Sequence, residues 1–156
     1  MVIERKVSES SIVSTRWMFP ADANPAGNVF GGAIIRYVDE VAGLVAERHS
    51  RSNVVLASMD RMDFHTPVKV GDLLTLKASV NFVGKTSMEI GVRIEAENMM
   101  TGEVRHAASA YAIMVALDEK GEPSEVPKII PETDEEKRRY KEAEARRDAR
   151  KLSKGK

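Results

Sequence analysis

Residues 31–48 read GGAIIRYVDEVAGLVAER, a stretch of helical length that contains no proline. Its apolar side chains surround nearly the whole of the helix that the stretch would form: Ala33, Ile34, Ile35, Val38, Val41, Ala42, Leu44 and Val45. A helix that is apolar on almost every side is normally buried. The stretch therefore predicts a buried helix with a sheet wrapped around it.

Strand patterns stand on both sides of this helix. Residues 74–82 and 88–96 alternate between apolar and polar side chains, and the turn Val83-Gly84-Lys85 between them predicts an antiparallel hairpin. Residues 104–117 are apolar on nearly both faces and predict a central strand, and residues 11–19 and 54–64 predict two more. The order of one strand, a buried helix and four antiparallel strands favours an α+β fold with a sheet around a long central helix.

The C-terminal residues 131–156 differ from residues 1–130, which make up the predicted single domain. Thr133 and Glu136 form a capping box after Pro131, the sequence signature of a helix start. Acidic residues stand four places before basic ones, which supports a helix, at Asp134–Arg138, Glu135–Arg139 and Glu142–Arg146. Because apolar residues are few, we expect this charged tail to be an exposed helix.

Composition excludes several classes of function. The 156 residues include no cysteine, which rules out a thiolate metal site and a cysteine nucleophile, and 24 basic residues balance 24 acidic ones, so no nucleic-acid partner is expected. His49, His65 and His106 lack the spacing of helix metal ligands, so no metal is expected. The longest apolar tract, residues 33–46, is too short and too charged to span a membrane, and residues 1–11 lack the apolar core of a signal peptide. We expect a cytoplasmic protein.

The loop PADANPAGNVFGG, residues 20–32, carries the candidate site. Gly31 and Gly32 at the helix start leave backbone N–H groups free and let a ligand approach the backbone closely. These groups lie at the positive end of the helix dipole, where they suit a carbonyl oxygen that gains negative charge. Asp39 lies seven residues after Gly32, two turns along the same face. An acid on an otherwise apolar helix is costly unless it is paired or functional.

Plainer explanations exist for the same residues. Asn24 and Asn28 are common turn formers, and Asp39 has Arg36 and Arg61 as candidate ion-pair partners. The glycine spacing matches neither the dinucleotide-binding fingerprint nor a P-loop. From the residues alone, both a structural and a catalytic role stay open for Asn24 and Asp39.

Two motifs together resemble the hot-dog-fold acyl-CoA hydrolases, and among them the cytosolic long-chain type. They are Asp22-Ala23-Asn24-x-x-Gly27-Asn28-Val29-x-Gly31-Gly32 and Val38-Asp39-Glu40-Val41-Ala42-Gly43. The similarity covers nearly the whole chain, through Arg48-His49, Phe64-His65, Val70-Gly71-Asp72, Lys85-Thr86-Ser87-Met88-Glu89 and residues 105–110 to Pro131-Glu132-Thr133. The fold that the resemblance implies, a long helix wrapped by an antiparallel sheet, agrees with the periodicity.

The resemblance implies a thioesterase that hydrolyses fatty acyl-CoA to a free fatty acid and coenzyme A, with no cofactor beyond the coenzyme A of the substrate. In tandem-domain members of the family, the active asparagine and aspartate sit on different hot-dog domains. One domain carries both here. The resemblance therefore implies a homodimer in which each site takes Asn24 from one subunit and Asp39 from the other, and a homohexamer built from such dimers.

In the implied mechanism, the Asn24 amide and the backbone N–H of Gly31 or Gly32 polarise the thioester carbonyl. Asp39 acts as a general base on water or as a nucleophile that forms an anhydride, and the sequence does not separate these two routes.

Contacts with the phosphates of coenzyme A are expected at two places. One is the polar turn Lys85-Thr86-Ser87, which a solvated hairpin tip explains equally well. The other is Arg48-His49 at the helix end, where cations are favourable in any protein.

Two other functions compete with hydrolysis. A hot-dog hydratase or dehydratase resembles its relatives in carrying a catalytic histidine before the helix, where this chain has Asn24. A non-catalytic acyl-CoA-binding regulator would need an output module, and no helix-turn-helix precedes Arg16. Release of free thiol from acyl-CoA distinguishes hydrolysis from both.

Overall fold

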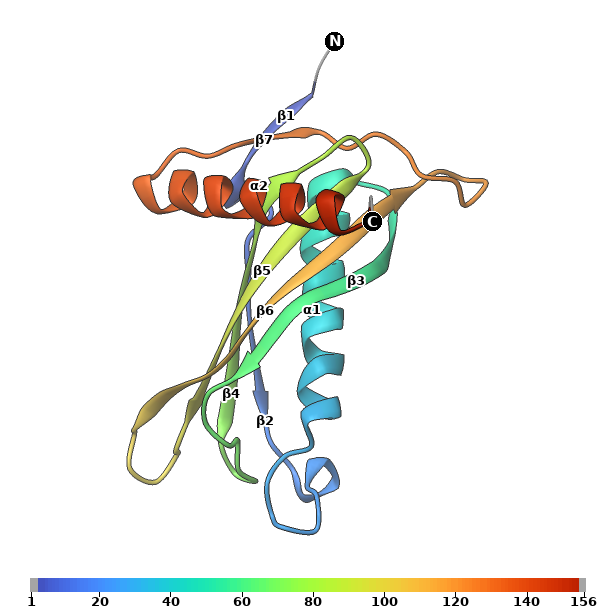
Figure 1. Ribbon diagram of the computed structural model, residues 1–156. Helices are drawn as coiled ribbons and strands as arrows, with labels where there is room; N and C mark the ends of the chain where they lie inside the picture. Colours follow the sequence, from blue (N-terminus) through green and yellow to red (C-terminus); the bar gives the residue numbers. More distant parts are fainter. Residues whose placement is uncertain (1–2, 155–156) are drawn as a thin grey trace.

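The computed structural model describes residues 3–154 as an antiparallel sheet that curves around one long helix (Figure 1). The helix is α1 (Gly31–Ser50). The five strands lie in the spatial order β2 (Ile12–Trp17), β4 (Leu73–Val83), β5 (Ser87–Glu97), β6 (Val104–Leu117) and β3 (Asn53–Phe64). The predicted α+β fold class is therefore confirmed.

The strand pairing agrees with the periodicity. β4 and β5 form the predicted hairpin, with Val83 opposite Met88. β6 is paired on both sides, with β5 and β3, as expected of a strand that is apolar on both faces. β3, 12 residues long, lies at one edge of the sheet. No helix within residues 3–154 has the length and apolar character needed to cross a membrane.

Several short elements were not predicted. β1 (Glu4–Lys6) and β7 (Lys128–Ile130) form a separate parallel pair, and two 3₁₀ turns lie at η1 (Val7–Glu9) and η2 (Pro20–Asp22). Each has three residues, which is too short for a periodic pattern to show.

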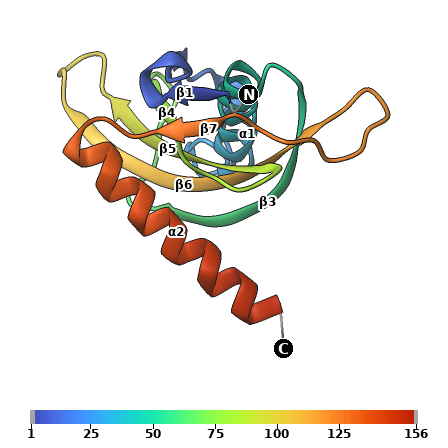
Figure 2. The same ribbon diagram turned by 90° about the horizontal axis from the view of Figure 1, so that it is seen from above.

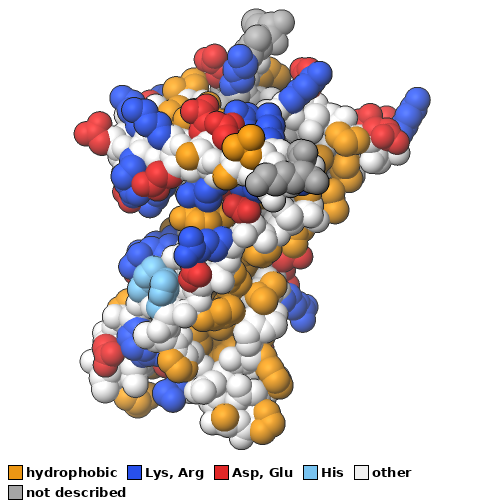
Figure 3. Space-filling model, in the orientation of Figure 1, with side chains coloured by type: hydrophobic (Ala, Val, Ile, Leu, Met, Phe, Trp, Pro, Cys, Tyr) orange, Lys and Arg blue, Asp and Glu red, His pale blue; other side chains and the backbone are white. Residues whose placement is uncertain are grey.

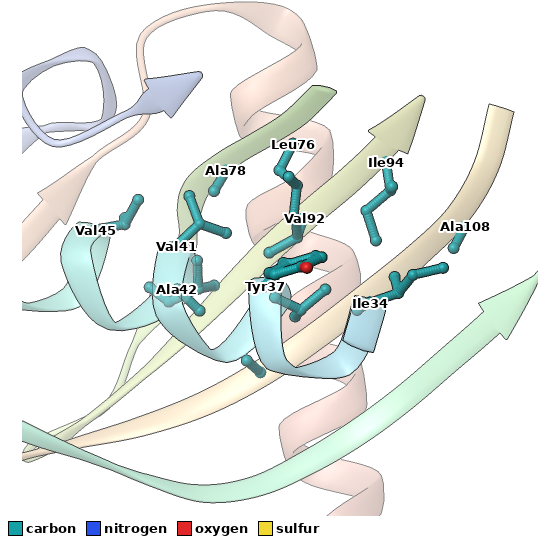
Figure 4. Packing of buried hydrophobic residues seen from close by; sticks show 14 of the residues in the cluster. Ile34, Tyr37, Val41, Ala42, Val45, Leu76, Ala78, Val92, Ile94 and Ala108 are labelled. Carbon is teal, nitrogen blue, oxygen red and sulfur yellow. The ribbon is translucent and has the colours of Figure 1, made fainter. Parts of the chain in front are cut away.

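The helix α1 is buried on one side only. Figure 4 shows its inward residues, Ile34, Tyr37, Val41, Ala42 and Val45, against apolar side chains of β4, β5 and β6. The rest of its circumference is exposed in the single chain, and at the two margins of this exposed arc Ile35 keeps 41% and Leu44 54% of full exposure. The prediction of burial on nearly every side is therefore wrong for one subunit, because the sheet covers only half of the helix.

The C-terminal helix α2 (Asp134–Lys154) lies on the other face of the sheet from α1 (Figure 2). Its capping box is confirmed: Thr133 Oγ1 accepts from the Glu136 N–H at 3.0 Å, and a Glu136 carboxylate oxygen accepts from the Thr133 N–H at 3.4 Å. Most of α2 is exposed, and Figure 3 shows its acidic and basic side chains intermingled. One side is docked, however, because Ala143 is fully buried.

An ion pair with a buried carboxylate holds α2 on the sheet. Glu89 of β5, only 2% exposed, accepts from both Nε and Nη2 of Arg146 at 2.9 and 2.8 Å, and from Asn81 Nδ2 at 3.0 Å. The guanidinium of Arg146 also lies 3.7 Å from the ring centre of Tyr111. The predicted pair Glu142–Arg146 is wrong, because Glu89 takes the guanidinium and Glu142 pairs with Arg138 instead.

Replacing Arg146 by methionine should weaken the fold far more than the same change at Arg138. Arg146→Met removes the bidentate partner of the buried Glu89 carboxylate and leaves only Asn81 and the more distant Arg150, 3.9 Å away, a loss of about 3 kcal/mol. Arg138→Met removes exposed pairs, each worth less than about 1 kcal/mol. Urea unfolding followed by circular dichroism measures both. Equal losses for the two variants would show that the Glu89 contact does not stabilise the protein.

Candidate active site

The loop before α1 is a tight turn built around Asn24. Asn24 Oδ1 accepts hydrogen bonds from the N–H of Ala26 at 2.9 Å and of Asn28 at 3.2 Å. Gly27 has a φ of 86°, a conformation that favours glycine over other residues. Because both backbone bonds use the oxygen, the amide nitrogen Nδ2 remains as a donor, and it makes no hydrogen bond to any described residue. Asn24 is a turn former, as the plainer explanation holds, and it also presents a free donor.

The start of α1 offers two more donors. Phe30 precedes the helix and provides no side-chain cap. The N–H groups of Ala33 and Ile34 bond to the Phe30 carbonyl, whereas those of Gly31 and Gly32 make no bond to any described residue. A Cβ on Gly32 would meet no heavy atom within 4 Å, so the approach to these N–H groups is open. Free N–H groups at a helix start attract negative charge.

Asp39 lies on the exposed side of α1, roughly 10 Å along the helix axis from Gly32. The ion-pair explanation for it is wrong, since Arg36 pairs with Glu40 at 3.2 Å and Arg61 pairs with Asp63 at 2.7 Å. Within residues 3–154, the Asp39 carboxylate makes no hydrogen bond or ion pair. Asp39 borders an open groove of about 270 Å³ between α1 and strands β3 and β6.

The residues expected to contact coenzyme A lie at the other end of α1. Arg48 is 16 residues from Gly32, about 24 Å along the helix. The turn at Lys85 lies at the same end of the sheet as Arg48. The Ala116 N–H, near the end of β6, donates to the Thr86 carbonyl oxygen there at 3.0 Å. Within one chain, the donors at Asn24 and Gly31 therefore lie far from the expected phosphate contacts.

Two of these residues are poorly suited to phosphate. His49 is fully buried, and its Nε2 lies 2.8 Å from the carbonyl oxygen of Pro127, so its ring cannot reach a bound coenzyme A. Arg48 lines an open cleft of about 750 Å³ that it shares with three carboxylates, those of Glu47, Asp118 and Glu119. At the hairpin turn Lys85 is exposed, and Thr86 and Ser87 are half-buried.

Known proteins match this chain in sequence and in fold. Residues 26–103 match the thioesterase superfamily. The acyl-CoA thioester hydrolase YkhA of Bacillus subtilis, described as uncharacterized, is 42% identical over 132 residues, which are 85% of this chain and 77% of YkhA. The chain belongs to the thioesterase superfamily.

Other members of the superfamily include animal proteins and solved structures. The mouse cytosolic acyl coenzyme A thioester hydrolase is 37% identical over 141 residues, which are 89% of this chain and 36% of the mouse protein. An apo-hexameric acyl-CoA thioesterase has a TM-score of 0.94 at 42% identity over 97% of both chains. The Staphylococcus aureus acyl-CoA hydrolase, in complex with butyryl coenzyme A, has a TM-score of 0.90 at 38% identity over 97% of this chain and 92% of its own. The predicted hot-dog fold and the resemblance to cytosolic acyl-CoA hydrolases are confirmed.

A contact that sequence reasoning missed ties the loop of this thioesterase-superfamily member to α1. The Tyr37 hydroxyl donates to Asp22 Oδ1 at 2.6 Å, and Asp22 Oδ2 accepts from the Phe19 N–H at 3.1 Å. The hydrogen bond that Tyr37 donates to the Asp22 carboxylate raises the pKa of Tyr37 above its usual value. The guanidinium of Arg16 lies 4.3 Å from the Tyr37 ring centre. Asp22 is the first residue of the loop motif, and its place in that motif was the only sequence signal that could have pointed to this contact.

The buried His49 should make stability fall as the medium becomes acidic. Burial lowers the pKa of His49 below its ordinary 6.5, so the folded protein holds the ring neutral while the unfolded chain accepts a proton. The contribution is therefore fully present above pH 6.5 and is lost as the pH falls below it. His49→Gln cannot take up a proton and should flatten this part of the curve. Urea unfolding of both proteins between pH 5 and 8 measures the difference, and parallel curves would contradict the assignment.

Proposed function

We propose that this protein is a thioesterase that hydrolyses fatty acyl-CoA to a free fatty acid and coenzyme A. One observation carries the proposal: free amide donors at Asn24, Gly31 and Gly32 and the unpaired carboxylate of Asp39 are set on and before a single helix. Donors and a carboxylate are the two requirements for attack on a thioester carbonyl. Relatives named for acyl-CoA hydrolysis, one in complex with butyryl coenzyme A, supply the substrate class.

The spacing of the two side chains supports their assignment. Crystal structures of the Staphylococcus aureus hydrolase include one variant with an asparagine replaced by alanine and another with an aspartate, 15 positions further along, replaced by alanine. Asn24 and Asp39 are separated by the same 15 positions. We assign them the polarising and the proton-accepting or nucleophilic role, respectively.

In the proposed reaction, the carbonyl oxygen of the thioester accepts hydrogen bonds from Asn24 Nδ2 and from the N–H of Gly31 or Gly32. These donors stabilise the negative charge that gathers on the oxygen as the carbonyl carbon is attacked. Asp39 either takes a proton from the attacking water or attacks the carbon itself and forms an anhydride that water then opens. In both routes the carbon–sulfur bond breaks and coenzyme A leaves as its thiol.

We propose that two chains share each site. The exposed arc of α1 carries Asp39 and is flanked by the half-exposed Ile35 and Leu44, and β3 has an unpaired edge 12 residues long. Both features suit a symmetric dimer, since a twofold axis pairs each surface with its own copy. Two α1 helices packed in opposite directions would bring Asn24 and Gly31 of one chain towards the half of the partner that holds its Lys85 turn. The hexamer named for a relative suggests that such dimers assemble further.

Lys85, Thr86 and Ser87 are the proposed contacts for the phosphates of coenzyme A. Lys85 is 80% exposed and lies 3.9 Å from Glu125, a pair that is weak at this exposure. His49 is not part of the proposed site, and Arg48 would contribute only against the three neighbouring carboxylates. No cofactor beyond the coenzyme A of the substrate is proposed, and the protein is expected in the cytoplasm.

Asp39→Asn should lower kcat about a hundredfold or more, because the amide can neither accept a proton nor attack the carbonyl. Asp63→Asn, the same change at an aspartate of β3 paired with Arg61, should keep normal turnover. Release of free thiol from an acyl-CoA gives both rates, and circular dichroism checks the fold. Normal turnover by a folded Asp39→Asn protein would falsify the role of Asp39.

Mixed dimers of two inactive variants should recover activity. Asn24→Ala and Asp39→Asn each spoil both sites of their own homodimer, whereas a mixed dimer has one site with both wild-type residues. Random mixing in equal amounts makes about half of the dimers mixed, so the recovery should approach a quarter of wild-type activity. The two variants are co-expressed with different tags, and thiol release is measured on the unfractionated mixture and on the purified doubly tagged dimer, which should reach about half of wild-type activity because one of its two sites is intact. A verified mixed dimer that is no more active than its parents would place the whole site within one subunit.

A further inference from the structure

Two segments of the family resemblance, Val70-Gly71-Asp72 and residues 105–110, lie outside the proposed site. The structure brings them together in an ion pair. Arg105, at the start of β6, donates from Nη2 to Asp72 Oδ2 at 2.9 Å and to the Pro67 carbonyl oxygen at 3.3 Å. The Asp72 side chain is only 6% exposed and that of Arg105 22%. A charge that is this well buried is costly unless it is paired, so the contact fixes both segments.

The ion pair belongs to the loop between β3 and β4, residues 65–72. Asp72 Oδ2 also accepts from the Lys69 N–H at 3.0 Å, and the Asp72 N–H donates to the Lys69 carbonyl oxygen at 3.1 Å. The Asp72 carbonyl oxygen accepts from the N–H of Met18, directly after β2, at 2.9 Å. Asp72 therefore closes a turn that is tied to β2 by the backbone and to β6 by Arg105.

The loop that carries Asn24 packs on this turn. Figure 1 shows both loops at the end of the sheet where α1 begins. The Val29 N–H donates to the Val68 carbonyl oxygen at 2.7 Å, and Asn28 and Lys69 form an antiparallel bridge. Val29 and Val68 are both buried, so the two loops meet along a surface that excludes water.

Asn28 is also the residue that holds Asn24 within its own loop. The Asn24 N–H donates to the Asn28 carbonyl oxygen at 2.7 Å, and Asn24 Oδ1 accepts from the Asn28 N–H at 3.2 Å. Because Asn28 is paired with Lys69 on its other side, direct contacts lead from Arg105 through Asp72 and the turn to the Asn24 amide.

The position of the Asn24 donor matters for turnover more than for substrate binding. Removing a donor to a developing oxyanion lowers kcat about a hundredfold or more, and a misplaced donor loses part of the same effect. The charge on the oxygen develops only as the carbonyl is attacked, so a small shift of the donor changes KM little.

We propose that Asp72 and Arg105 are positioning residues of the thioesterase site, which hold the turn of residues 65–72 and through it the amide donor of Asn24. This inference rests on the proposed thioesterase function. Asp72 and Arg105 themselves do not touch the substrate; they act through Asn24.

The test compares Arg105→Met with Arg150→Met. Arg150 makes a matched pair with Asp60, also at 2.9 Å and with an arginine 24% exposed, but this pair joins α2 to β3. Arg105→Met should lower kcat about tenfold with KM near the wild-type value, whereas Arg150→Met should keep normal turnover. Arg105→Lys should recover part of the loss, because one nitrogen makes both contacts and an ammonium can replace it.

Two checks keep a folding defect apart from a loss of positioning. Circular dichroism and sedimentation establish that each variant folds and assembles. If Arg105→Met does not fold, the double variant Asp72→Asn/Arg105→Met takes its place, because it leaves no unpaired charge in the loop and should show the same fall in kcat.

Hydrogen exchange separates this inference from the proposed function. Peptides that cover residues 20–30 should exchange their amide protons several-fold faster in Arg105→Met than in the wild type or Arg150→Met. If they do and the wild type releases no thiol from acyl-CoA, the positioning is right and the hydrolytic function is wrong. If exchange in folded Arg105→Met is unchanged, if its kcat is normal, or if Arg150→Met loses as much turnover, the inference fails.

Discussion

The one-sided packing of α1 on the sheet is the constraint on which the rest of the structure depends. Val38, Ala42 and Val45 are fully buried against the inner face, and burying such side chains contributes roughly 1.5–3 kcal/mol for each valine. A helix fixed along one side has no rotational freedom. Asp39 is therefore held on the opposite side, and the first N–H groups of the helix point out of one end of the sheet.

The position of the loop before α1 depends on this packing. Tyr37 is buried on α1, and its hydroxyl bonds to Asp22 at the beginning of the loop, while Val29 N–H bonds to the Val68 carbonyl at 2.7 Å at the other end. Between these two anchors, the Asn24 side chain satisfies backbone donors of the turn with its oxygen. The rigid turn orients the remaining amide donor without any further contact, a preorganisation that suits stabilisation of developing charge.

The sequence predicts the fold well where a periodic pattern of apolar residues is long and reflects burial within a single chain. The alternation in β4 and β5 and the helical stretch of α1 give these elements nearly their observed bounds, because each side chain faces either the core or water. Predictions fail where long-range partners compete. Arg146 has Glu142 four places before it, yet Glu89, far away in sequence and desolvated on β5, takes the guanidinium. The same limit applies to the site. Asn24, Gly31 and Asp39 can be proposed from their motif, but the burial of His49 and the acids around Arg48 follow only from where β7 begins and β6 ends near α1.

The helix α1 has more apolar residues than the sheet of its own chain covers. Ile35 and Leu44 stay about half exposed in the single subunit, and as exposed large side chains they would promote nonspecific association if nothing covered them. Gly43, on the same side, lowers the helical stability of the chain without a steric reason inside it. The exposed apolar side chains and the glycine therefore belong to, or border, the exposed arc of α1 that carries Asp39. A helix surface that is unfavourable in isolation at several positions is the kind of surface that the proposed second chain would cover.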